Sequence, residues 1–118
     1  MKPRRLIRVF IGHDYFGGNK KRLTPYRKIF QRACFAAQMS LGIRVEPVYG
    51  STKTLPPALL REIKNAGGDI PGIQKGWFWP RIDGLIRVSD LALFDLTLNN
   101  GRSSDVNWNV LMELGVAI

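Results

Sequence analysis

Glu113 is the residue of this sequence whose setting most strongly suggests chemistry. It lies in a predicted helix from residue 106 onward that is apolar around most of its circumference. Asn109 precedes it by four residues, so the two side chains would lie one above the other on the same helical face. A glutamate is seldom buried without a partner or a task. It could be a reactive carboxylate, or it could pair with Arg81 or Arg102 and only anchor the helix.

Two polar segments follow predicted strands and are expected at the same place. The loop over residues 12–18 (GHDYFGG) follows the first apolar run, and Asp95 lies at the end of the run 91–96. Ligands of open α/β sheets bind outside the carboxyl ends of the strands, so both segments would contribute to one site. Asp95 could instead cap the following turn. His13 beside Asp14 is a candidate base, although a single histidine on a loop is also typical of an ordinary surface.

Other familiar sites are not indicated. The loop after the first strand has neither a P-loop ending nor a G-x-G-x-x-G pattern, and no spacing is typical of metal ligands. Trp77, Phe78 and Trp79 could stack on a base, or belong to a core or an interface. A group of basic residues could bind phosphates, although no known nucleic-acid-binding module is present; its members are residues 20–22, Arg27, Lys28 and Arg32.

The apolar patterns predict alternating strands and helices. Thr24 and Pro25 favour a helix start at the N-cap and first helical position, and Gly42 its end. A nearly continuous apolar run is typical of a strand covered on both faces, and Pro47 suggests an edge strand. The predicted strands are 6–11, 43–49 and 91–96, the predicted helices are 24–41, 58–65, 79–88 and 106 onward, and 67–76 is predicted as loop. This order indicates an α/β fold with a parallel sheet and flavodoxin-like layers.

Length and charge limit the alternatives. With 118 residues, 45% of them hydrophobic, the chain has one domain's worth of sequence, 1–118. The formal net charge is +9, concentrated in the first half, which favours anionic partners. The single Cys34, the lack of a long apolar run and the lack of a secretory leader indicate a cytoplasmic protein without a membrane segment. The sequence stops inside an apolar helix, so we expect the domain to be incomplete at its C-terminus.

Two stretches carry a resemblance to a known group of proteins. Residues 88–97 (VSDLALFDLT) and 109–117 (NVLMELGVA) resemble the signature of bacterial TIR-like domains and of nucleoside 2-deoxyribosyltransferase-like proteins. The likeness is good over about residues 85–118 and holds only in outline over 6–41. The segment between Thr97 and Asn109 is longer than the turn usual in the group.

The resemblance implies a flavodoxin-like domain that cleaves the N-glycosidic bond of NAD or of a nucleoside. Glu113 would be the catalytic residue, because a carboxylate can stabilise or attack the oxocarbenium carbon that forms at the sugar. NAD or the nucleoside would be the substrate, with no cofactor and no metal. Four residues would bind the substrate: Asp14, Phe16, Asp95 and Asn109.

The resemblance also implies a biological role and an alternative function. Such domains generally work as homo-oligomers, and this one would be an effector in bacterial antiviral defence. Several relatives are not enzymes, so a non-catalytic nucleotide-binding or self-assembling signalling module on the same fold is the alternative. A basic adaptor that binds nucleic acid through Lys20, Lys21 and Arg22 is a third hypothesis.

Overall fold

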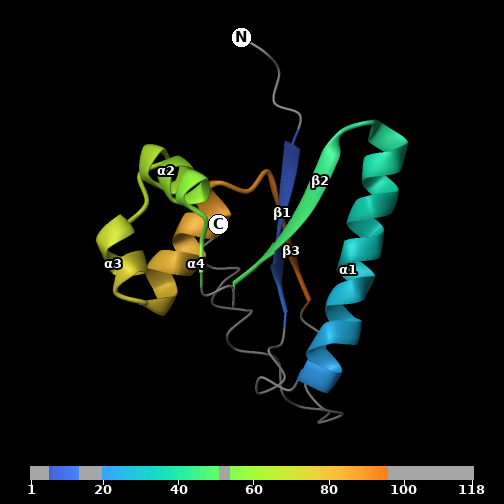
Figure 1. The fold of residues 1–118 in the computed structure, drawn as a ribbon, viewed down its shortest axis with the longest axis horizontal. Coiled ribbons are helices and arrows are strands. Elements are labelled where there is room, and N and C mark those ends of the chain that lie inside the picture. The colour runs from blue at the N-terminus through green and yellow to red at the C-terminus, as the bar shows by residue number, and fades with distance from the viewer. Residues whose placement is uncertain (1–5, 14–19, 51–53, 96–118) are drawn as a thin grey trace.

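A computed structural model describes residues 6–13, 20–50 and 54–95 of the chain as a three-stranded sheet between two helical layers (Figure 1). The single helix α1 lies on one side of the sheet, and α2, α3 and α4 lie on the other. In chain order the elements are β1 (Leu6–Gly12), α1 (Lys20–Leu41), β2 (Arg44–Tyr49), α2 (Pro57–Asn65), α3 (Ile70–Gln74), α4 (Phe78–Arg87) and β3 (Leu91–Phe94).

All three strands run parallel, with β1 in the middle of the order β2-β1-β3. Leu6 pairs with Arg44 in β2, and Val9 pairs with Leu91 in β3. The α/β fold with a parallel sheet is therefore confirmed, and the order is the one with which a flavodoxin-like sheet begins. Within the described residues Pro47 lies in an outer strand, as predicted, where its missing N–H costs least.

Alternation along β1 divides the core between the two faces. Val9 and Ile11 face α1 and pack with the buried Cys34, while Phe10 faces the opposite layer. The core under α1 consists of Val9, Ile11, Cys34, Val45 and Tyr49. The core under α2 and α4 consists of Phe10, Leu55, Ile63, Ile82, Leu85 and Val88.

Arg8 joins three elements at the amino edge of the sheet. Its guanidinium donates two hydrogen bonds to the Glu62 carboxylate of α2, Nη1 to Oε1 at 2.9 Å and Nη2 to Oε2 at 2.5 Å. Its backbone N–H donates to Asp90 Oδ2 at 2.9 Å, and its carbonyl accepts from the Asp90 N–H at 2.8 Å. Since Asp90 directly precedes β3, this one residue fixes the position of α2 and the entry of β3 against β1.

Helix α1 begins earlier than predicted. The sequence placed Thr24 at the N-cap and Pro25 at the first helical position, but the helix starts at Lys20 and contains Pro25 in its second turn. Two effects stabilise the extra turn: Leu23 is buried there, and lysine and arginine are good helix formers. The predicted end is confirmed, because Gly42 has a φ of 68° and its N–H donates to Gln38 O. No helix among the described residues is long and apolar enough to cross a bilayer.

Part of the predicted loop 67–76 is helical instead. The short helix α3 has Asp69 as its N-cap, and Asp69 Oδ1 accepts a hydrogen bond from the Gly72 N–H at 3.0 Å. Pro71 lies in the first turn, where its fixed φ favours a helix. The cap and the proline together outweigh the glycines that suggested a loop.

Strand β3 is covered on one face only by the described residues. Phe94 packs against Phe10 with ring centroids 5.9 Å apart, but Leu91 and Leu93 are 59% and 54% exposed. Helix α1 covers β1 and β2 and does not extend over β3 (Figure 1). The expectation of a strand covered on both faces is therefore met on one face by the described residues and stays a prediction for the other. The predicted helix from residue 106 onward lies outside the described residues.

Gly84 lies inside α4, where a glycine is ordinarily unfavourable, because α4 crosses α2 closely. An added Cβ would lie 2.9 Å from Ile63 Cγ2 and 3.1 Å from Ile73 Cδ1. Ile63 is fully buried and branched at Cβ, so it cannot swing aside cheaply. Close packing of the two helices thus requires a glycine at this position.

We expect Gly84→Ala to lower the free energy of unfolding by about 1–3 kcal/mol, because the new methyl overpacks the core. Urea unfolding followed by circular dichroism measures the effect. The control is Ala36→Gly at an exposed position of α1, where alanine should be the more stable residue by about 1 kcal/mol. A Gly84→Ala protein as stable as the unmodified chain would contradict the close crossing.

Candidate functional site

The carboxyl ends of the three strands bring separate parts of the sequence to one edge of the sheet, the lower edge in Figure 1. β1 ends at Gly12, β2 at Tyr49 and β3 at Phe94. The Asp95 N–H donates to Gly12 O at 2.8 Å, so the pairing of β1 with β3 continues one residue beyond the strand. His13 and the half-buried Asp95 therefore follow neighbouring strands at the same level.

His13 lies among three aromatic rings. Its ring centroid is 5.2 Å from that of Tyr26, 6.2 Å from that of Phe30 and 5.5 Å from that of Tyr49. Tyr26 and Phe30 are one helical turn apart on α1 and pack edge to face at 5.2 Å. The imidazole is held by packing at the end of β1, which makes it a positioned group and not an ordinary surface histidine.

Arg27 links this aromatic group to the end of β2. Its Nε donates to His13 Nε2 at 3.4 Å, and its guanidinium carbon lies 4.3 Å from the centroid of the Tyr49 ring. The Tyr49 hydroxyl in turn donates to Arg27 O at 3.4 Å. An arginine that stacks on a ring at a sheet edge keeps a permanent positive charge in a fixed place.

A second guanidinium reaches the end of β2 from the opposite helical layer. Arg81 Nε, on the first half of α4, donates to Gly50 O at 3.0 Å. The same group lies 5.6 Å from the centroid of the Phe78 ring. Arg27 and Arg81 thus approach the carboxyl end of β2 from the two faces of the sheet. Arg81 is one of the two arginines that the sequence offered as an ion-pair partner for Glu113. In the structure its Nε–H binds Gly50 O.

Burial shifts the titration of two groups beneath this edge. It raises the pKa of Tyr49, an effect that the nearby charge of Arg27 partly opposes. Burial also raises the pKa of the Cys34 thiol, which lies in the core under α1. Both groups are therefore held in their neutral forms, and the positive charge of the edge comes from the arginines.

The predicted site residues are only partly within the described chain. Asp95 is placed at the carboxyl edge, at the end of β3, as the sequence indicated. Glu113, Asn109, Asp14 and Phe16 lie outside the described residues.

Sequence reasoning did not bring four residues of this edge together. It considered His13 as a candidate base or an ordinary surface residue, Arg27 only as a phosphate-binding candidate and Arg81 only as an anchor, and it did not consider Tyr49. A signal was present for the first two, because Tyr26 and Phe30 are aromatic at i, i+4 spacing and flank Arg27 on one face of a helix that packs beside the loop of His13. No local pattern indicates that Arg81 reaches Gly50, since the contact joins residues 31 positions apart.

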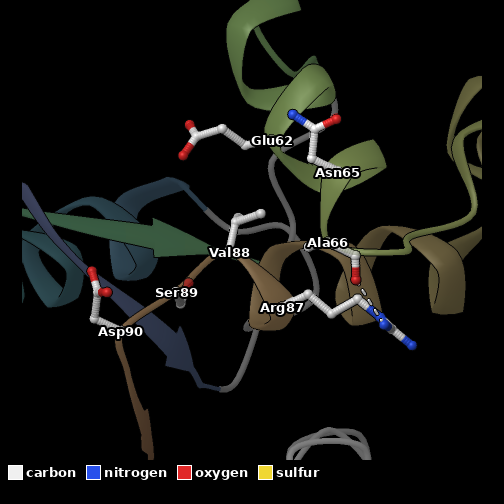
Figure 2. Close-up of a pocket in the computed structure, with 7 residues that line it drawn as sticks. All are labelled: Glu62, Asn65, Ala66, Arg87, Val88, Ser89 and Asp90. Carbon is white, nitrogen blue, oxygen red and sulfur yellow. Dashed lines mark hydrogen bonds between the residues drawn. The ribbon is translucent and has the colours of Figure 1, made fainter. Parts of the chain in front are cut away.

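A depression of about 380 Å³ lies at the opposite, amino edge (Figure 2). Figure 2 shows Glu62 and Asn65 of α2 on one side and the end of α4 with its link to β3 on the other. Its charged groups already serve the fold: Glu62 binds Arg8, and Arg87 donates to Asp83 Oδ2 at 2.7 Å and to Ala66 O at 2.9 Å. This depression is shallow and structural, and the carboxyl edge remains the better candidate site.

A second cavity of about 320 Å³ lies between β2 and α2 and extends to Tyr49. Its walls are mostly apolar, from Val48, Leu55 and Leu59 among others. Polar groups that could orient a ligand come mainly from Arg8 and Glu46, and Arg8 is occupied by Glu62. The cavity could accept an apolar part of a ligand held at the carboxyl edge, but it offers no chemistry of its own.

Comparison of the chain with protein-family models, with curated proteins and with solved structures gives no match. Within residues 6–13, 20–50 and 54–95, no three His, Cys, Asp or Glu side chains gather closely enough to hold a metal ion. The described edge therefore offers aromatic rings, two guanidiniums, an imidazole and a carboxylate as its chemical groups.

We expect Tyr49→Phe to flatten the loss of stability at alkaline pH. Because the folded state raises the pKa of Tyr49 above its unfolded value, the stabilisation from its neutral form is present below about pH 10 and is lost as the pH rises further. Phenylalanine has no proton to lose, so the variant should gain on the unmodified chain above that pH. Denaturant unfolding at neutral and alkaline pH measures the difference, and parallel curves for the two proteins would contradict a buried phenol.

Proposed function

We propose that this chain is a cytoplasmic, TIR-like nucleotide-processing domain that cleaves the N-glycosidic bond of NAD or of a nucleoside. One observation carries the proposal: three parallel strands deliver His13, Tyr49 with Gly50, and Asp95 to a single edge, where Arg27 and Arg81 also converge. The resemblance of residues 88–97 and 109–117 to this group of proteins supports it from the sequence side.

The chemical groups of this edge suit the parts of a nucleotide. Guanidiniums bind phosphate oxygens through paired N–H donors and keep their charge at any relevant pH. A carboxylate such as Asp95 accepts hydrogen bonds from ribose hydroxyls. Aromatic rings offer stacking surfaces to a base. A nucleotide combines an anionic, a hydroxylated and an aromatic part, and each has a matching group at this edge.

Glycosidic cleavage needs a carboxylate at the sugar carbon, and Glu113 is our candidate. When the bond between ribose and base breaks, positive charge develops at that carbon, and an anionic oxygen nearby stabilises it or attacks it. Asn109, one turn earlier, would bind sugar hydroxyls or the base edge. Both residues follow β3, the strand that also delivers Asp95, so a crossover helix would bring them toward the same edge.

The alternative is a nucleotide-binding or self-assembling signalling module without catalysis. The exposed Leu91 and Leu93 on β3 favour it, because an uncovered apolar strip beside a nucleotide site is suited to contacts between subunits. Under this alternative the same arginines bind the nucleotide, but no bond is broken. A role in bacterial antiviral defence is compatible with either form.

We expect the purified chain, at high protein concentration, to release nicotinamide from NAD or a free base from a nucleoside. Glu113→Gln should lower the rate about a hundredfold or more, because the amide cannot stabilise the developing charge. Asp95→Asn should raise KM about tenfold through loss of a charged hydrogen bond to the sugar. Chromatography of the products measures both effects.

The matched control is Asn65→Ala in the depression at the amino edge, which should leave the rate and KM unchanged. Circular dichroism establishes that each variant is folded. Tight nucleotide binding without any product at any protein concentration would replace the enzyme with the signalling module. An Asp95→Asn protein that behaves like Asn65→Ala would remove the carboxyl edge from the proposal.

A further inference from the structure

Three large aromatic residues in succession remain at the surface of the α3–α4 turn. Trp77 is 53% exposed, and Phe78 and Trp79 are each 38% exposed. Large aromatic side chains usually contribute to stability by burial, so a cluster of them left in water marks a contact surface. We call the group of Trp77, Phe78 and Trp79 with Lys75 and Arg81 the aromatic platform.

Cations lie over the rings of the aromatic platform. Lys75 Nζ is 4.8 Å from the centroid of the Trp77 ring, and the Arg81 guanidinium carbon is 5.6 Å from that of Phe78. Phe78 and Trp79 pack edge to face, with centroids 4.9 Å apart and planes at 76°. Ring faces and positive charges thus alternate over a few residues. Bases and phosphates alternate in the same way along a nucleic-acid strand.

The platform is fixed before any ligand arrives. Gly76 has a φ of 78°, which reverses the chain and brings Lys75 onto the Trp77 ring. The Trp77 N–H donates to Gly72 O at 3.0 Å, and the Gly76 N–H donates to Ile73 O at 2.9 Å. Arg81 is held by its hydrogen bond to Gly50 O. A backbone that is already ordered loses little entropy on binding, which favours affinity.

The net positive charge of the chain favours an anionic partner. With 18 Lys and Arg against 9 Asp and Glu, the chain attracts polyanions. Exposed Lys20, Lys21 and Arg22 open α1 at the same edge of the sheet on which α4 begins (Figure 1). They lie on the side of the sheet opposite the platform, so they add to the overall attraction of a polyanion and not to the platform itself.

We propose that the aromatic platform binds single-stranded nucleic acid, with bases stacked on Trp77 and Trp79 and phosphates held by Lys75 and Arg81. An anionic membrane is the alternative partner, and binding to vesicles is one outcome of the test below. The proposal does not rest on glycosidic cleavage, because none of the platform aromatics belongs to the group around His13.

The test uses fluorescence anisotropy of a labelled oligothymidylate of about 12 nucleotides with the full chain. Trp77→Ala and Trp79→Ala should each weaken binding about tenfold, while Trp77→Phe, which keeps a ring, should recover most of the loss. Phe35→Ala is the matched control, because Phe35 is an aromatic residue of α1 that is 61% exposed. It should bind like the unmodified chain.

Salt dependence separates phosphate contacts from stacking. The logarithm of the binding constant should fall linearly with the logarithm of the salt concentration, and Lys75→Gln should reduce that slope by about 0.7. Lys64→Gln at the end of α2 should leave it unchanged. Glu113→Gln should bind as the unmodified chain does, so a failure of the cleavage proposal leaves this result intact.

Three results would overturn the proposal. Equal binding by Trp77→Ala and Phe35→Ala would show that the rings play no part. Affinity that depends only on Lys20, Lys21 and Arg22 would reduce the interaction to general charge attraction. Binding to vesicles of acidic phospholipid that depends on Trp77, without binding to the oligonucleotide, would assign the surface to a membrane instead.

Discussion

Arg8 is the residue on which the arrangement of the sheet most depends. It is a charged side chain on the central strand, only 11% exposed, and it would be very unfavourable there without Glu62. The bidentate pair offsets the cost of burial and at the same time fixes α2 against β1, while the two backbone bonds to Asp90 align β3. Because Arg8 is bound on both sides, the pairing of β1 with β3 starts in a defined register, and Gly12 and Asp95 meet at the far end.

The acidic residues are distributed unequally between the two edges of the sheet. Most described acids are used in structural contacts: Glu62 binds Arg8, Asp83 binds Arg87, and Asp69 caps α3. Glu46 pairs with Arg44 near the start of β2. Asp95 is the described acid at the carboxyl edge, where it follows β3, while Arg27 and Arg81 approach the end of β2. The two edges of the sheet therefore differ in character, one neutralised by ion pairs and the other positive with a single described carboxylate.

The sequence predicted the elements better than their contacts. Apolar runs and glycine stops located every described strand and the ends of α1 and α2, because burial and turn geometry are local properties. The start of α1 and the helix α3 were wrong, since burial of Leu23 and the cap by Asp69 outweighed the local signals from Pro25 and the glycines. Glycine is unfavourable inside a helix, yet Gly84 is required in α4 by its close contact with Ile63. The two residues are too far apart in the sequence for a local pattern to indicate that contact.

For the candidate site the same distinction applies. Asp95 was predictable, because an acid at the end of an apolar strand is unusual and its edge follows from parallel topology. The group around His13 was not, since it joins the end of β1, one face of α1 and the end of β2. The aromatic pair Tyr26 and Phe30 was a partial signal for it, but nothing in the sequence places the Tyr49 ring beside His13.

The carboxyl edge combines two aromatic groups that serve different contacts. The rings around His13 join the end of β1, one face of α1 and the end of β2, at the strand ends where we propose that a nucleotide binds. The aromatic platform lies at the α3–α4 turn, in the helical layer on the other side of the sheet. Arg81 belongs to both, because it binds Gly50 at the end of β2 and lies over Phe78. A polyanion on the platform would therefore draw on the same charge that a nucleotide needs, and the two ligands should compete for Arg81 even though they stack on different rings.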